Sequence, residues 1–244
     1  MVSGRRGGAA LISGSSAMSN DMQKISGAAV EGRWDYSVGY LPAGTLQDPR
    51  IPLLIATPPY KIAPVTAKPI VQSQLPSIEP TPQQFVSHVH ANPGRLSDRP
   101  AAVLNTLGRG RVIYVGFDLF EVYWRMNHWW IKALIRRHLE DVGFKPTAMI
   151  SADGTVHSNL RRREDELYLH MICFSSNLAA GGGYPPIEHV PRLHNISVQL
   201  ELDRQPSDVI LEPAGRSIKC DYRDGYVKVD LPSVSLYNVL RVSL

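Results

Sequence analysis

The stretch AVLNTLGRGRVIYV, residues 102–115, decides the fold of the first half of the chain. Two apolar runs with strand character, Ala102–Thr106 and Arg111–Val115, flank the sequence LGRG at positions 107–110. Glycine readily adopts the positive φ angles that a tight hairpin turn requires. We therefore predict two strands joined directly by this turn.

One strong helix is predicted to follow these strands. Asp118 is suited to cap its first turn, and Glu121, three residues later, completes a capping box. Apolar residues recur at helical spacing within residues 131–142, and Gly143 is a natural C-terminal cap. The aromatic segment Trp124–His128 is predicted to divide the helix into a short and a long piece.

The residues before the hairpin contain short apolar runs, of which 9–13 and 52–56 are predicted strands. Prolines punctuate residues 58–82, and proline lacks a backbone donor. We expect this region to form edges or extended links rather than central strands. Residues 1–144 together are predicted to form an α/β domain.

Residues 147–244 have the pattern of a small antiparallel β-sandwich, because several short strands with alternating apolar residues follow one another. Asp153-Gly154 and Asp224-Gly225 are hairpin turn signals. The predicted strands are 148–151, 155–162, 167–174, 195–202, 208–212, 217–222, 226–231 and 236–242.

Composition excludes several classes of protein. The 244 residues carry a formal net charge of +4, with 43% hydrophobic and 20% charged residues, which is typical of a globular protein. No window approaches the ~18 apolar residues of a membrane span, and the scattered positive charge gives no nucleic-acid footprint. The two cysteines and the absence of a complete phosphate-binding glycine motif lead us to expect no cofactor. The apolar run 9–12 is shorter than the ~7–15 residues of a secretion signal core, so we expect a cytoplasmic protein.

His88 and His90 are candidate site residues, because alternate residues of an extended segment project to the same side. That spacing suits a metal ion, but no third ligand is visible nearby, and Asp98 and His128 join the pair only if the fold brings them together. We favour a hydrogen-bonded or interface role for the two histidines and expect no metal.

Aromatic residues crowd around the predicted helix start. They either pack in the core, because aromatic side chains carry large burial areas, or form a subunit interface or a sugar-stacking surface. The residues are Phe117, Phe120, Tyr123, Trp124, Trp129 and Trp130.

Several motifs, in this order, resemble the C-terminal region of β-galactosidases of the glycoside hydrolase family 42 type. In the first half the resemblance is carried by residues 6–12, 85–93, 105–114, Leu119-Phe120, Tyr123 and His128. In the second half it is carried by residues 169–172, 176–177 and 185–191.

The resemblance implies that residues 1–144 are a truncated flavodoxin-like, glutamine-amidotransferase-like trimerisation domain and that residues 147–244 are a small β domain. The family's catalytic barrel is absent, and its nucleophile and general acid belong to that barrel. No residue of this sequence inherits those roles. A truncated sheet should have an incomplete face or an unpaired edge, which favours association with another chain.

We therefore expect a non-catalytic assembly scaffold that forms a homo-oligomer or docks on a missing catalytic barrel. By the resemblance, the residues near a subunit boundary or in the wall of the sugar cleft are His88, His90, Tyr123, Trp124 and His128. One alternative is an independent hydrolase in which Asp98 or Asp118 joins the two histidines.

A second alternative is a carbohydrate-binding module. Tyrosine rings stack on sugars in such modules, and the candidate residues are Tyr184, Tyr222 and Tyr226.

Overall fold

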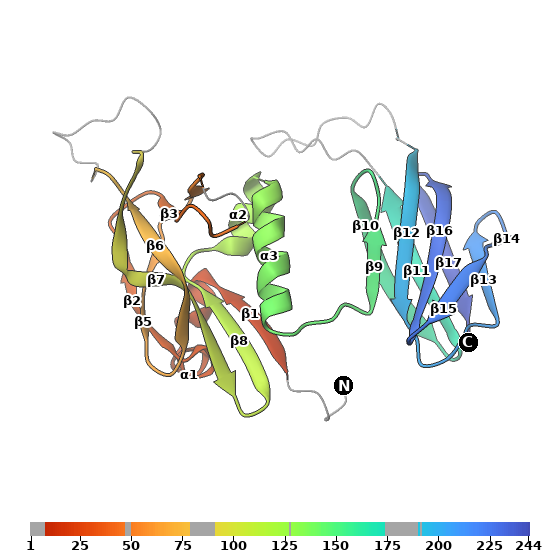
Figure 1. Ribbon diagram of the computed structural model, residues 1–244, viewed down its shortest axis with the longest axis horizontal. Coiled ribbons are helices and arrows are strands. Elements are labelled where there is room, and N and C mark those ends of the chain that lie inside the picture. The colour runs from red at the N-terminus through yellow and green to blue at the C-terminus, as the bar shows by residue number, and fades with distance from the viewer. Residues whose placement is uncertain (1–7, 47–49, 79–90, 127, 174–189, 191) are drawn as a thin grey trace. The chain divides into compact units, whose positions relative to one another are not determined.

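The computed structural model describes residues 8–46, 50–78, 91–126, 128–173, 190 and 192–244. The chain divides into two compact units, residues 1–145 and 146–244, and each is described separately (Figure 1). Strands are the dominant elements of both units, and the first unit also contains helices.

The first unit is built around a six-stranded sheet in the order β1-β8-β7-β6-β3-β4. Only β1 and β8 are parallel, and the other neighbours are antiparallel. The opening strand β1 lies at one edge of this sheet and β4 at the other. The strands are β1 (Ala9–Ser13), β3 (Gly39–Leu41), β4 (Leu53–Ile55), β6 (Lys68–Pro76), β7 (Pro93–Leu107) and β8 (Gly110–Val115).

The predicted hairpin at the centre of the sheet is confirmed. Strands β7 and β8 pair in antiparallel register up to Leu107 and Gly110, and Gly108 has φ 56° in the turn between them. Strand β7 is longer than expected, because it begins at Pro93 rather than Ala102.

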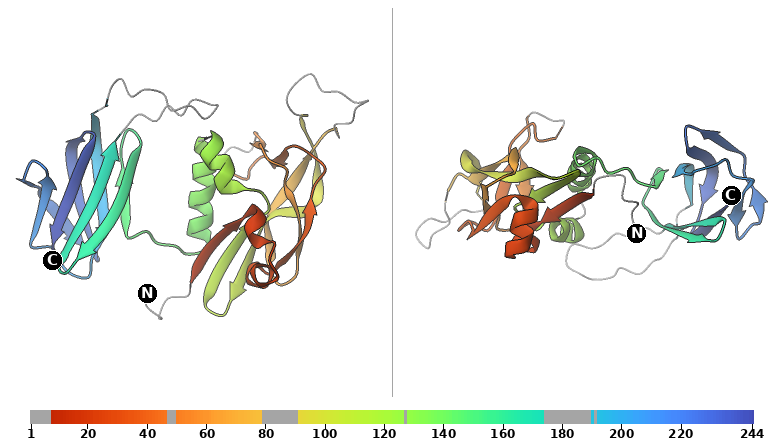
Figure 2. Two further views of the ribbon diagram at one scale, coloured as in Figure 1. Left: turned by 180° about the vertical axis from the view of Figure 1, so that it is seen from behind. Right: turned by 90° about the horizontal axis from the view of Figure 1, so that it is seen from below.

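Each face of this sheet has its own apolar core. Ile113 of β8 packs with Leu119 of helix α2 (Leu119–Met126) and Ile131 of helix α3 (Trp129–Asp141). Tyr114, the next residue of β8, packs on the other face with Ile62. That second face is covered by η1 (Gly14–Ala17), α1 (Asn20–Ser26) and the paired strands β2 (Ala28–Arg33) and β5 (Tyr60–Pro64), so α1 and α3 lie on opposite sides of the sheet (Figure 2).

The proline-rich region differs from its prediction. It contains β5 and β6, and β6 lies between β7 and β3 inside the sheet rather than at an edge. Its pairing with β7 has repeated register shifts, and it pairs with β3 through Tyr40 and Gln74. These bulges let the sheet include Pro69 and Pro76, which cannot donate to a regular ladder.

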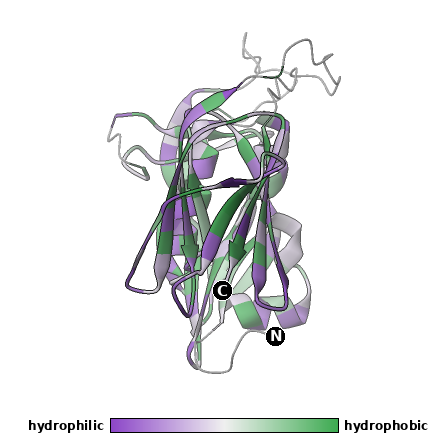
Figure 3. Cartoon of the chain, turned by 90° about the vertical axis from the view of Figure 1, so that its right-hand side faces the viewer, coloured by the Kyte–Doolittle hydropathy of each residue, from purple (hydrophilic) through white to green (hydrophobic). Residues whose placement is uncertain are grey.

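The second unit is an antiparallel sandwich of two sheets, in the orders β10-β11-β17-β13-β14 and β15-β16-β12-β9. Polar and apolar residues alternate along its strands, so that the apolar side chains of both sheets meet in one core (Figure 3). The strands are β9 (Ala148–Ser151), β10 (Val156–Arg163), β11 (Glu166–Cys173), β12 (Leu193–Glu201), β13 (Asp208–Glu212), β14 (Arg216–Ser217), β15 (Cys220–Arg223), β16 (Tyr226–Val234) and β17 (Tyr237–Ser243).

Two predictions for this unit are corrected. Asp153-Gly154 does not close a hairpin, because β9 pairs with β12 in one sheet and β10 pairs with β11 in the other. The predicted strand 217–222 is divided into β14 and β15, which belong to different sheets. The Asp224-Gly225 turn is confirmed, with positive φ at both residues between β15 and β16.

Candidate association surface

Three large aromatic side chains on helices α2 and α3 of the first unit are exposed. Trp124 is 71% exposed, Trp129 is 70% exposed and Phe120 is 47% exposed. We call these three residues the aromatic surface. Most large apolar side chains are buried in a folded domain, so a group of exposed aromatic residues marks a candidate contact with another molecule.

The geometry of α2 explains why Phe120 and Trp124 share one face. They are four residues apart and therefore neighbours on the helix surface. The opposite face carries Leu119 and Val122, which are buried in the sheet core. Helix α2 thus contributes side chains both to the core and to the aromatic surface.

The predicted break between the two helices is confirmed, and Trp129 is the first residue of the helix after it. Helix α2 ends at Met126, and α3 begins at Trp129 with His128 at its N-cap in an extended conformation. Trp130 is buried in the core, whereas Trp129 and His128 are exposed. Of these two adjacent tryptophans, Trp130 therefore contributes to the core and Trp129 to the exposed surface.

Tyr123 has a mixed environment. Its ring is half-buried against the core, and the Lys132 ammonium lies 5.8 Å from the ring centroid. This contact between a cation and an aromatic ring joins α2 to α3. Tyr123 consequently acts more as a link between the helices than as an exposed contact.

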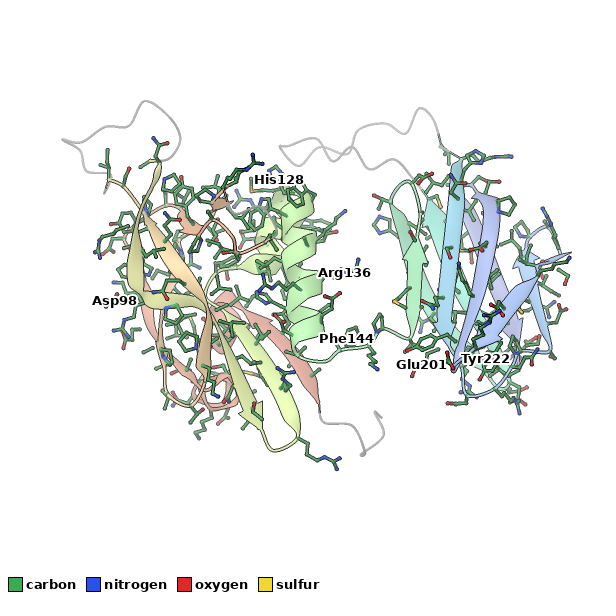
Figure 4. The ribbon with its side chains drawn as sticks, in the orientation of Figure 1. Asp98, His128, Arg136, Phe144, Glu201 and Tyr222 are labelled. Carbon is green, nitrogen blue, oxygen red and sulfur yellow. The ribbon has the colours of Figure 1, made fainter. Side chains whose placement is uncertain are left out.

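Of the other predicted site residues, the structure describes Asp98, Asp118 and His128. His88 and His90 lie outside the described residues. Asp98 and His128, their possible partners, lie on well-separated parts of the first unit (Figure 4). Within the described ranges, His, Cys, Asp and Glu side chains form no group of three that could hold a metal ion.

Asp118 braces the start of α2. Its Oδ1 accepts a hydrogen bond from the Ser15 backbone N–H at 3.2 Å, and its Oδ2 accepts one from Arg33 at 3.0 Å. The predicted capping partner Glu121 instead pairs with Arg125 at 3.4 Å. Asp118 therefore joins η1 and strand β2 to the start of α2, the helix that carries Phe120 and Trp124.

The hydrogen bonds of Asp118 require the backbone at Gly14 to approach its carboxylate closely. Gly14 has φ 55°, and a Cβ atom at this position would lie 1.8 Å from Asp118 Oδ1. Arg33 also donates to the Tyr60 hydroxyl at 2.6 Å and lies over its ring. The hydrogen bond to Tyr60 is the main cause that raises the pKa of Arg33, and the nearby Asp118 charge adds to it. Asp118 is thus held by a guanidinium and a backbone amide.

The structure describes two of the three tyrosines proposed for sugar stacking, and these two do not share one surface. Tyr184 lies outside the described residues. Tyr222 packs against the sandwich core, pairs with buried Val227, and donates its hydroxyl to the Leu202 carbonyl. Tyr226 follows on the opposite side of the pleat, so the two rings do not face the same way.

Comparison with known structures identifies proteins that share this fold. The chain is similar to α-L-fucosidase isoenzyme 2 from Paenibacillus thiaminolyticus, with a TM-score of 0.75 and 20% identity over 96% of this chain and 36% of the fucosidase chain. It is also similar to a β-galactosidase from Bacillus circulans sp. alkalophilus, with a TM-score of 0.53 and 14% identity over 97% of this chain and 29% of that chain. A catalytic mutant of a GH42 β-galactosidase from G. stearothermophilus gives a TM-score of 0.50 and 13% identity over 98% of this chain and 28% of its own.

These similarities establish a shared fold that extends over both units. The chain spans about a third of the length of the glycosidases it matches. No protein-family model matches the sequence, and the search of curated proteins gives no match. No helix among the described residues is long and apolar enough to cross a membrane.

Proposed function

We propose that this chain is a non-catalytic assembly scaffold of a glycoside-hydrolase-like protein in carbohydrate metabolism. Its first unit corresponds to the flavodoxin-like trimerisation domain of the β-galactosidase type, and its second unit to the terminal β domain. The proposal is supported by a fold shared with a fucosidase and two β-galactosidases over only part of their chains.

The observation that carries the assembly role is the exposure of Phe120, Trp124 and Trp129 on one unit. Aromatic residues are enriched at protein interfaces, where their burial contributes most of the binding free energy. We assign this surface to contacts with further copies of the same chain.

The charges on the helices that carry the aromatic surface do not oppose self-association. The Glu121–Arg125 pair lies on α2, and the Arg136–Glu140 pair, at 3.0 Å, lies on α3. Both signs of charge are therefore present on the helices that carry the aromatic surface. Copies related by symmetry can align acidic with basic residues without a net repulsion.

Light scattering after size exclusion tests the proposal. We expect wild-type protein to have a mass that is a multiple of 27.0 kDa. The double substitution Trp124→Ser and Trp129→Ser should shift it to the monomer. Phe144→Ser is the matched control, because Phe144 is an exposed aromatic residue of the same unit outside the aromatic surface, at 46% exposure.

A mass of 27.0 kDa at every concentration contradicts self-association, as does a double variant that assembles like the wild type. The non-catalytic role has a separate test. Turnover of aryl galactosides or fucosides by the purified chain, abolished by His88→Ala, would favour the hydrolase alternative instead.

A further inference from the structure

The outer face of the five-stranded sheet in the second unit carries a set of side chains that the sandwich core does not use. Along β11, Leu169 and Met171 are buried, whereas Tyr168, His170 and Ile172 project from the opposite side of the pleat. Strand β17 pairs with β11 so that Ile172 lies directly opposite Tyr237, another outward residue.

Two rings on this face are held side by side. His170 Nδ1 and the Tyr237 hydroxyl are hydrogen-bonded at 2.7 Å, the ring centroids are 6.0 Å apart, and the planes differ by 20°. The two rings are thus nearly parallel but strongly offset, and the hydrogen bond joins them at their edges. Because Tyr237 is 47% exposed, part of its ring remains accessible to a ligand.

The rings have an apolar neighbour that is also exposed. Tyr237 is 47% exposed, and Ile172, its direct cross-strand partner, is 41% exposed. We call His170, Ile172 and Tyr237 the ring surface. It comprises three residues and is partly apolar, which suits the C–H face of a single sugar ring better than a protein interface of the usual size.

The charged groups of this sheet lie along it from the ring surface towards its other end, since Glu212 is opposite Val239 and Glu166 is opposite Ser243. Glu166 accepts hydrogen bonds from the Tyr168 hydroxyl and, at 3.2 Å, from Arg241. A second carboxylate, Glu212, lies 3.6 Å from the same guanidinium. The outward arginines of β10 and β17 are matched in number by the outward carboxylates of β11 and β13. These residues are Arg161, Arg163, Arg241, Asp208, Glu166 and Glu212.

The equal numbers of outward acidic and basic residues bear on the class of ligand. A nucleic acid or an anionic partner needs an excess of positive charge, which this face does not offer. A neutral polyhydroxylated molecule needs no such excess, and Glu212, in the same cross-strand row as His170, offers it a hydrogen-bond acceptor.

We propose that the ring surface binds a neutral pyranoside of galacto configuration through stacking on Tyr237. The sugar class rests on the proposed function, since the chain shares its fold with a fucosidase and β-galactosidases. Galactose and fucose have the same relative arrangement of ring hydroxyls. Their axial hydroxyl at C4 leaves one ring face formed by C–H groups, and such a face packs on a tyrosine ring.

Saturation-transfer NMR on the full chain tests this site, with methyl β-D-galactopyranoside and methyl α-L-fucopyranoside as probes. We expect transfer from the protein to the C–H protons of the stacked face. Tyr237→Ala should weaken binding about tenfold because the stacking contact is lost. Tyr237→Phe keeps the ring and should retain most of the binding, which separates stacking from the hydrogen bond to His170.

Tyr226→Ala is the matched control, because Tyr226 is a tyrosine of the other sheet, outside the ring surface. It should bind both sugars like the wild type. If Tyr237→Ala fails to fold, His170→Ala provides a second variant of the same surface, and its binding should also fall. Absence of transfer to both probes, or equal binding by Tyr237→Ala and Tyr226→Ala, would overturn the proposal.

The failure of this site and of the assembly role are distinguishable. Light scattering measures association without any sugar, and the NMR experiment detects sugar binding by a monomer equally well. Equal transfer to methyl β-D-glucopyranoside would overturn the assignment to galacto-configured sugars, whatever the mass in solution.

Discussion

His138 is a buried polar residue on the core side of α3. It is 1% exposed, and neither ring nitrogen has a hydrogen-bond partner among the described residues. Burial lowers the pKa of His138, and the Asp141 carboxylate, 3.7 Å from Nδ1, partly offsets this effect. The helix therefore buries a neutral imidazole.

This burial predicts that the first unit loses stability in acid. The unfolded chain, in which histidine has a pKa of about 6.5, binds a proton more readily than the folded one. The free energy of unfolding should thus be constant above pH ~6.5 and fall as the pH decreases below it. Urea unfolding followed by tryptophan fluorescence reports this unit, because all four tryptophans belong to it.

His138→Leu should remove most of the acid sensitivity between pH 8 and about 5. His128→Gln is the control, since His128 is exposed and makes no side-chain cap bond. An unchanged pH dependence in His138→Leu would show that other groups cause the acid destabilisation.

At the scale of elements, the local spacing of apolar residues was sufficient to predict α3 but not to predict β6. The apolar stripe within residues 131–142 and the Gly143 stop predict the position of α3, because both signals lie within the helix itself. Strand β6 is held by pairing with β7, which begins only after the intervening residues 77–92. Bulges in this pairing accommodate the prolines of β6. No short pattern encodes such long-range pairing, so a proline-rich strand appears irregular in the sequence.

The brace at Asp118 makes a prediction about how α2 is attached. Asp118→Ala removes the acceptor of the Ser15 amide and leaves Arg33 without its carboxylate. We expect the free energy of unfolding to fall by about 2 kcal/mol, the range for hydrogen bonds to a charged group. Asp98→Ala is the control, because Asp98 is exposed and its hydrogen-bond partner is the adjacent Ser97.

Asp98→Ala should change the free energy of unfolding by less than about 0.5 kcal/mol, as for most surface substitutions. Equal effects of the two variants in denaturant titrations would mean that Asp118 does not hold the helix.

At the scale of the whole molecule, the two candidate surfaces differ in how far the sequence could reveal them. The aromatic surface can be recognised from the sequence, because aromatic residues are frequent in this segment and the four-residue spacing of Phe120 and Trp124 indicates a shared helix face. Which of Trp129 and Trp130 is exposed depends on where α3 begins. His170 and Tyr237 are separated by 67 positions, and only the register of β11 with β17 brings them together.

The independence of the two cores predicts that residues 146–244 fold alone. Every described strand pair of the sandwich lies within this unit, and its core is formed by its own side chains. The isolated segment should unfold cooperatively, as measured by circular dichroism, since it has no tryptophan. Leu240→Ala, at a fully buried position, should destabilise it by about 2–5 kcal/mol. The same substitution should leave the tryptophan-detected unfolding of the first unit unchanged in the full chain. A segment without a cooperative transition, or a shift of that tryptophan signal, would mean that the sandwich depends on residues before 146.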